Sequence, residues 1–166
     1  MWNALGGFLE KLAELPGCRE LEPVARLRVA FAHPRFIHLR RRNRVRQAVS
    51  WALAAQTGHY SSQEAAIRAP LAEPTFDLQL LDGLHRLIRE ADEGWDSFFA
   101  ESGIEPLRLW YEYLVPNLEL ALAGILAWLG VPAPGRIELG GLRHQPQATT
   151  LNVEWEGRFR ALRPYA

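Results

Sequence analysis

The stretch FIHLRRRNRVRQAVSWALAAQTG, residues 36–58, decides the fold of this chain. The run RFIHL at 35–39, which overlaps the beginning of this stretch, is aromatic and β-branched without a helical period, which predicts a short buried strand. Asn43 then suits a helix N-cap, and apolar residues follow at helical spacing until Gly58. These apolar residues are Val45, Ala48, Val49 and Ala52. The stretch is therefore predicted to form a strand, a basic turn and a helix.

The rest of the chain adds mainly helices to this unit. The sequence PLRLWYEYLV alternates in polarity and predicts a second strand, and Asn117 is predicted to cap the helix after it. Strands that alternate with helices indicate an α/β fold with parallel strands in one domain, although two strands make a poor sheet on their own. The predicted helices cover residues 2–15, 23–32, 76–102 and 118–130, with a short helix in the tail; residues 59–75 are predicted to be a long loop.

Composition limits the class of partner. The 19 basic and 19 acidic residues give no net charge, which argues against nucleic acid as a partner. Cys18 is the only cysteine, so no disulfide framework or cysteine zinc site is possible within one chain, and a cytoplasmic location is the default expectation. The histidines show no metal-ligand spacing, and Asp92 and Glu93 are predicted on a helix surface. We expect no metal and no transmembrane segment, because the uncharged run at 120–136 is short and interrupted by prolines.

Five arginines lie between Arg40 and Arg46 in this neutral chain. They follow the predicted strand, and ligands of open α/β sheets bind beyond the carboxyl ends of the strands, where helix N-termini favour anions. Asn43, Arg46 and Ser50 share one face of the predicted helix. An arginine at the strand end and a serine further along the helix are suited to holding one phosphate. A solvated basic turn is the alternative that these residues leave open.

The order FIHLRRRNRVRQAVSWALAAQTG resembles the nucleotide-binding segment of sulfotransferases that use 3′-phosphoadenosine 5′-phosphosulfate (PAPS), most closely the bacterial family typified by trehalose 2-sulfotransferase. The segment MWNALGGFLEKL is similar to the helix that follows a Lys-x-Met-Trp segment in that family. The segments GIEPLRLWYEYLV and ILAWLGV are similar to its later strand and helix, and RHQPQATTLNVEW is similar to its closing segment, in the same order. The resemblance implies a P-loop-type sulfotransferase fold that lacks its first strand and loop, helix-rich with a small parallel sheet. Residues 1–166 would then form a single, partial sulfotransferase domain.

The resemblance also implies roles for particular residues. In sulfotransferases an arginine and a serine eight residues later hold the 3′-phosphate of PAPS, and Arg42 and Ser50 have that separation. Arg143, in the closing segment, becomes a candidate third contact to this phosphate, and Trp155 is predicted either to pack in the core or to face the adenine. Gln56 and His59 are predicted to lie near the acceptor, a carbohydrate or glycolipid hydroxyl. The family includes dimers, so a homodimer is expected.

Two family features have no counterpart in these residues: the loop that binds the 5′-phosphosulfate and the acidic general base. Three interpretations stay open, namely a fragment, a gene whose start was placed at an internal methionine, or a true short homologue. We expect no sulfuryl transfer by residues 1–166 alone and assign no catalytic residue; His59 as a substitute base is the weaker alternative. A non-catalytic nucleotide-binding or protein-interaction module is the competing function, and RNA binding is disfavoured by the zero net charge.

Overall fold

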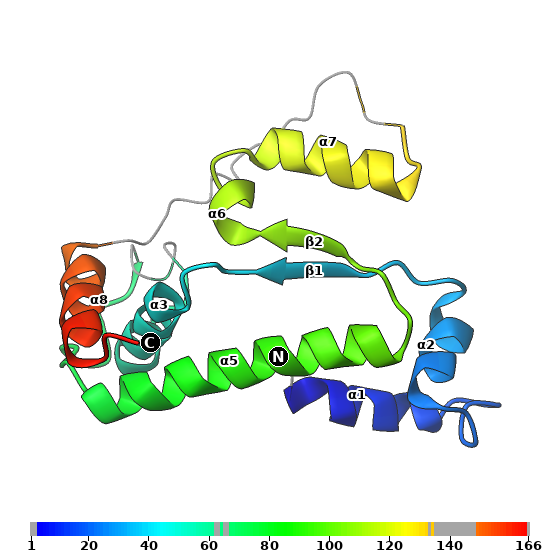
Figure 1. Ribbon diagram of the computed structural model, residues 1–166, viewed down its shortest axis with the longest axis horizontal. Coiled ribbons are helices and arrows are strands. Elements are labelled where there is room, and N and C mark those ends of the chain that lie inside the picture. The colour runs from blue at the N-terminus through cyan, green and yellow to red at the C-terminus, as the bar shows by residue number, and fades with distance from the viewer. Residues whose placement is uncertain (1–2, 62–63, 65–66, 133, 135–148, 166) are drawn as a thin grey trace. The chain divides into compact units, whose positions relative to one another are not determined.

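A computed structural model describes residues 3–61, 64, 67–132, 134 and 149–165 of the chain (Figure 1). The chain divides into two compact units. The first unit contains residues 1–40 and 90–109, and the second contains residues 41–89 and 110–166. Each unit has an apolar core of its own.

The first unit joins two short helices to the sheet. Its core forms where the apolar faces of the two N-terminal helices meet, at Leu9, Leu12 and Leu27, with Phe36 and Phe98 packed against them. The two strands lie side by side and run in the same direction (Figure 1). The elements are α1 (Asn3–Ala13), α2 (Pro23–Phe31), β1 (Ile37–Arg40), the second half of α5 (Leu78–Glu101) and β2 (Leu107–Trp110).

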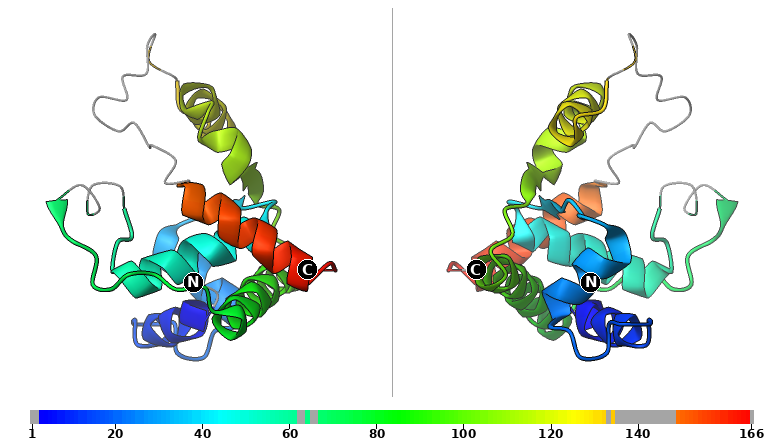
Figure 2. Two further views of the ribbon diagram at one scale, coloured as in Figure 1. Left: turned by 90° about the vertical axis from the view of Figure 1, so that its left-hand side faces the viewer. Right: turned by 90° about the vertical axis from the view of Figure 1, so that its right-hand side faces the viewer.

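The second unit is helical, and its core lies between α3, the first half of α5 and α8. Helix α8 packs along α3 (Figure 2). Val49 of α3, Leu81 of α5 and Phe159 of α8 are almost completely buried in this core. The remaining elements are α3 (Arg44–Thr57), α6 (Tyr111–Leu114), α7 (Leu118–Leu129) and α8 (Thr150–Leu162).

Helix α3 forms as the sequence predicts. The Asn43 side chain accepts a hydrogen bond from the backbone N–H of Arg46 and caps the helix. The helix ends at Gly58, whose φ of 72° lies in the left-handed region that glycine adopts without strain. All four residues of the predicted apolar stripe are buried. The basic turn therefore leads directly from β1 into a capped helix.

Two details of the predicted pattern are wrong. The strand expected over residues 106–115 ends at Trp110, and Tyr111 begins the short helix α6. Alternating polarity fits a four-residue helical turn as well as a strand, and the bond from the Val115 N–H to the Tyr111 carbonyl closes the turn. Asn117 does stand at the N-cap of α7, but its side-chain amide donates to the Tyr113 carbonyl instead of capping α7.

The small parallel sheet and the high helix content confirm the predicted fold class. Among the described residues, no helix has both the length and the apolar character needed to cross a bilayer.

Candidate functional site

The arginines of the 40–46 cluster have different surroundings, and Arg40 is paired with carboxylates. Its Nη1 lies 2.9 Å from Asp96 Oδ2, and its Nη2 lies 3.3 Å from Asp92 Oδ2. The Arg40 and Asp92 side chains are 13% and 15% exposed. The prediction that Asp92 and Glu93 both lie on a helix surface is confirmed for Glu93, which is exposed, and is wrong for Asp92. Asp92 serves instead to neutralise the arginine at the end of β1.

Asp96 and His38 extend this ionic group in the first unit. Arg108 Nη1 lies 3.0 Å from Asp96 Oδ1 and 3.5 Å from His38 Nδ1. Burial alone would raise the pKa of Asp96, but the bonds and charges of Arg108 and Arg40 outweigh it and lower this pKa. Burial and the nearby Arg40 lower the pKa of His38 below 6.5. The carboxylates of Asp92 and Asp96 thus offset the charges of Arg40 and Arg108, and the group stabilises β1.

Arg42 has different surroundings. Its guanidinium lies over the Trp110 ring, 5.1 Å from the ring centroid, and the residue is exposed. Within the described part of the chain, its guanidinium forms no ion pair or hydrogen bond. A guanidinium that stacks on a ring keeps its N–H donors available around its edge. Arg42 thus has both the charge and the free donors needed for an oxyanion.

Glu112 holds the backbone of the turn that carries Arg42. Its two carboxylate oxygens accept hydrogen bonds from the Arg42 N–H, both at 3.1 Å, and one of them also accepts from the Asn43 N–H at 3.2 Å. Partial burial would raise the pKa of Glu112, but the backbone hydrogen bonds outweigh it and lower this pKa. Arg41 lies over the neighbouring Tyr111 ring, 3.8 Å from its centroid. The segment 110–112 therefore contacts all three residues of the segment 41–43.

Helix α8 contributes two charged side chains at the start of α3. Glu156 accepts a 2.7 Å bond from the Asn43 amide and lies 3.9 Å from Arg46 Nε. Arg160 donates to Asn43 Oδ1 at 3.0 Å and to Glu156 Oε1 at 3.1 Å. Local sequence patterns did not predict the contacts of α8 with Asn43 and Arg46, because more than a hundred residues separate these partners. They fix the N-cap of α3 and pair Arg46.

Ser50 is partly exposed on α3, beyond the first turn. Its hydroxyl forms no hydrogen bond within the described part of the chain, whereas the Thr57 hydroxyl of the same helix bonds back to the Leu53 carbonyl. A helical serine whose hydroxyl does not bond back to its own helix retains its full hydrogen-bonding capacity. Arg42 and Ser50 are thus the two predicted phosphate contacts that the structure describes.

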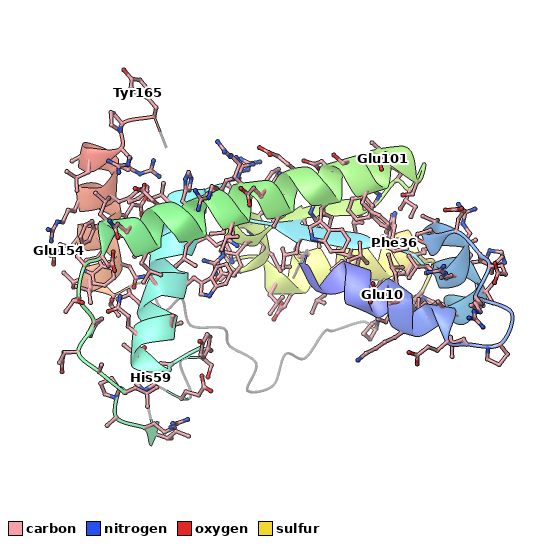
Figure 3. The ribbon with its side chains drawn as sticks, turned by 90° about the horizontal axis from the view of Figure 1, so that it is seen from below. Glu10, Phe36, His59, Glu101, Glu154 and Tyr165 are labelled. Carbon is pink, nitrogen blue, oxygen red and sulfur yellow. The ribbon has the colours of Figure 1, made fainter. Side chains whose placement is uncertain are left out.

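The other predicted site residues have separate surroundings. The Gln56 amide donates to the Thr75 carbonyl at 3.0 Å and accepts from the Thr75 N–H at 2.7 Å, so it ties the end of α3 to the segment before α5. His59 follows α3 (Figure 3), and its buried Nε2 has no hydrogen-bond partner within the described part of the chain. Arg143 lies outside the described residues.

Trp155 belongs to the core of the second unit. It is 2% exposed and meets Phe76 in an edge-to-face contact with ring centroids 5.7 Å apart. Burial of the whole ring between helices is the packing role that the sequence allowed, and it leaves no face for an adenine.

Comparison with known proteins supplies the class. The chain belongs to the Stf0 sulphotransferase family, whose model matches residues 1–162. It is 29% identical over 170 residues to a trehalose 2-sulfotransferase of Mycobacterium tuberculosis, and 28% identical over 164 residues to a trehalose 2-sulfotransferase of Mycolicibacterium smegmatis. These matches cover 99% and 96% of this chain, but 60% and 58% of the two relatives. The chain therefore spans about three fifths of the length of the relatives, and the resemblance seen in the sequence is confirmed.

Proposed function

We propose that this chain supplies the 3′-phosphate site of a sulfotransferase that moves a sulfuryl group from PAPS to a hydroxyl of a carbohydrate or glycolipid. The observation that carries the proposal is the state of Arg42: its guanidinium is stacked on Trp110, has no acidic partner within the described residues and stands eight residues before Ser50. Membership of the Stf0 sulphotransferase family supports sulfuryl transfer as the class of reaction. PAPS as donor and a sugar as acceptor are the finer parts of the proposal.

Arg42 and Ser50 would anchor the donor without entering the reaction. In the reaction, an acceptor oxygen forms a bond to sulfur, the bond from sulfur to the 5′-phosphate oxygen breaks, and the acceptor proton is lost to a base. The products are a sulfate ester and adenosine 3′,5′-bisphosphate. Fixing the 3′-phosphate orients the distant sulfur for in-line attack, and such positioning supplies a large share of the rate in group transfer of this kind.

Of the two proposed acceptor contacts, His59 has the stronger support. The buried Nε2 of His59 has no hydrogen-bond partner among the residues that the structure describes, which favours a polar ligand, because an unmatched buried polar atom is costly. Gln56 would act indirectly, since both ends of its amide hold Thr75. Trehalose, the acceptor named for the relatives, is the first sugar to test. A cytoplasmic location and a homodimer remain predictions.

Calorimetric titration with adenosine 3′,5′-bisphosphate tests the site. We expect Arg42→Ala to weaken binding about tenfold or more, roughly 1.4 kcal/mol, and Ser50→Ala about fivefold, because each removes a bond to a charged phosphate. Arg28→Ala is the matched control: Arg28 is an exposed arginine on α2, in the first unit. It should leave the affinity within twofold.

Equal affinities of wild type and Arg42→Ala would overturn the assignment of this arginine. A sulfuryl-transfer assay with PAPS and trehalose tests the activity separately. We expect residues 1–166 to bind the nucleotide without transferring the sulfuryl group. Transfer by these residues alone would mean that they include the contacts to the phosphosulfate.

A further inference from the structure

We infer that Glu112 is a positioning residue for the nucleotide site: it fixes the turn at 41–43 so that Arg42 is held in place before the phosphate arrives. The inference rests on the proposed function, because it concerns the same phosphate. Glu112 does not touch the phosphate in this scheme. It acts through the backbone of the residue that does.

The contact between the two segments is built residue by residue. Trp110 lies under the Arg42 guanidinium, and Tyr111 lies under that of Arg41. The Glu112 carboxylate then accepts three hydrogen bonds of 3.1–3.2 Å from the backbone N–H groups of Arg42 and Asn43. Both the side chain and the main chain of Arg42 are therefore held by one short segment, at the point where the strand β2 passes into α6.

The hydrogen-bond partners of the Glu112 carboxylate distinguish a positioning role from an ion pair with Arg42. A carboxylate near a phosphate-binding arginine would normally compete with the phosphate for the guanidinium. Here its oxygens bond to main-chain N–H groups, and no ion pair joins Glu112 to Arg42 among the described contacts. The negative charge thus stabilises the shape of the turn while the guanidinium donors stay open.

The same contacts exclude a competing position for the phosphate. The N–H groups of Arg42 and Asn43 precede α3, where an anion would otherwise bind them. Since Glu112 occupies them, the ligand is directed to side chains, namely the Arg42 guanidinium and the Ser50 hydroxyl. An arginine that is already ordered loses less conformational entropy when its ligand binds.

The charge-neutral variant Glu112→Gln gives opposite results for the two possible roles. If Glu112 acted only as a nearby negative charge, its removal would tighten the binding of adenosine 3′,5′-bisphosphate. If it positions Arg42, binding should weaken about three- to tenfold, because one oxygen acceptor is replaced by an N–H₂ donor that cannot bond to a backbone N–H. Glu154→Gln is the matched control, since Glu154 is an exposed acid on α8 of the same unit (Figure 3). It should leave the affinity within twofold.

A double-mutant cycle makes the test specific. In the Arg42→Ala background, Glu112→Gln should no longer change the affinity, because the group that it positions has been removed. Unchanged or tighter binding by Glu112→Gln alone would overturn the inference, as would an equal loss in both backgrounds. If the Gln variant does not fold, as judged by its circular dichroism, the cycle is run with Glu112→Asp, which keeps the charge but is too short to reach both N–H groups.

The two proposals fail differently. If Arg42→Ala leaves the nucleotide affinity unchanged, the assignment of Arg42 to the phosphate is wrong. If Arg42→Ala weakens nucleotide binding as expected but Glu112→Gln leaves the affinity unchanged, only the positioning role of Glu112 is excluded.

Discussion

Arg40 and Arg42 stand two residues apart in the same basic run, yet the structure uses them in opposite ways. Arg40 is mostly buried and its guanidinium is divided between Asp92 and Asp96. Arg42 is exposed, rests on an aromatic ring and has no carboxylate partner within the described residues. A run of like charges is therefore not one functional unit. Each arginine must be judged by which groups already use its donors.

The difference follows from how a guanidinium forms its contacts. Two carboxylates neutralise the charge of Arg40 and use N–H groups on both of its terminal nitrogens. A ring face attracts the charge of Arg42 without using any in-plane donor. The first arrangement adds stability, and the second leaves a site for an anion. Substitutions should therefore affect folding at one position and ligand binding at the other.

Arg40→Met should produce the largest effect on stability. Methionine keeps the apolar stem but removes the cation that Asp92 and Asp96 share, at a position where Arg40 and Asp92 are mostly buried. We expect the free energy of unfolding to fall by about 2–4 kcal/mol, somewhat less than for a fully buried pair, because Asp96 is partly exposed. Urea unfolding followed by circular dichroism measures this loss.

Arg42→Met is the control for that measurement. It removes the same charge from an exposed site, so the loss of stability should stay below about 1 kcal/mol. Nucleotide affinity should show the reverse order, with a loss at position 42 and none at position 40. Similar losses of stability for the two variants would remove the distinction between them.

The pKa of His38 gives a second way to examine Arg40. Burial and the positive charge of Arg40 keep the pKa of this histidine below 6.5, so the folded chain binds fewer protons than the unfolded chain just below that pH. The contribution of His38 to stability therefore declines as the pH falls from about 6.5 toward the lower pKa of the folded state. An NMR titration of the His38 ring should give a midpoint below 6.5.

Arg40→Met should raise that midpoint toward 6.5, because one of the nearby positive charges has been removed. Arg42→Met should leave it unchanged. A His38 midpoint that stays the same in Arg40→Met would show that the charge of Arg40 does not lower this pKa.

Local signals predicted the frame of the site well. The cap at Asn43, the buried stripe of α3 and the end at Gly58 all depend on residues within a few positions of one another, and all were confirmed. The transition from β2 to α6 was missed, because alternating polarity does not distinguish a strand from a single helical turn. Local periodicity thus fixes long elements and fails at short ones.

The partners of the charged residues were beyond local reasoning. Asp96 is 56 residues from Arg40, and Glu112 is 70 residues from Arg42. Only the fold brings such groups together, so local patterns did not show which of the five arginines carboxylates neutralise. One signal was available for Glu112: an acidic side chain on the segment expected to pair with a basic strand is a candidate for the N–H groups of the turn after that strand.

The ring under Arg42 should produce the smallest effect on binding, and the chain provides its own control. Trp110→Leu removes the ring beneath the proposed phosphate contact, so the affinity for adenosine 3′,5′-bisphosphate should fall about two- to fivefold, or 0.5–1 kcal/mol. Tyr111→Leu removes the ring beneath Arg41, which has no assigned contact, and should change the affinity less than twofold. Calorimetry resolves this difference.

Trp110→Phe should retain most of the affinity, because a smaller ring still offers its face to the guanidinium. Equal losses for Trp110→Leu and Tyr111→Leu would mean that the two rings stabilise the 41–43 turn together and not Arg42 in particular. A loss confined to Trp110→Leu would instead extend the contrast between Arg40 and Arg42 to Arg41: of two neighbouring arginines that both lie over rings, only the one in register with Ser50 would contribute to binding.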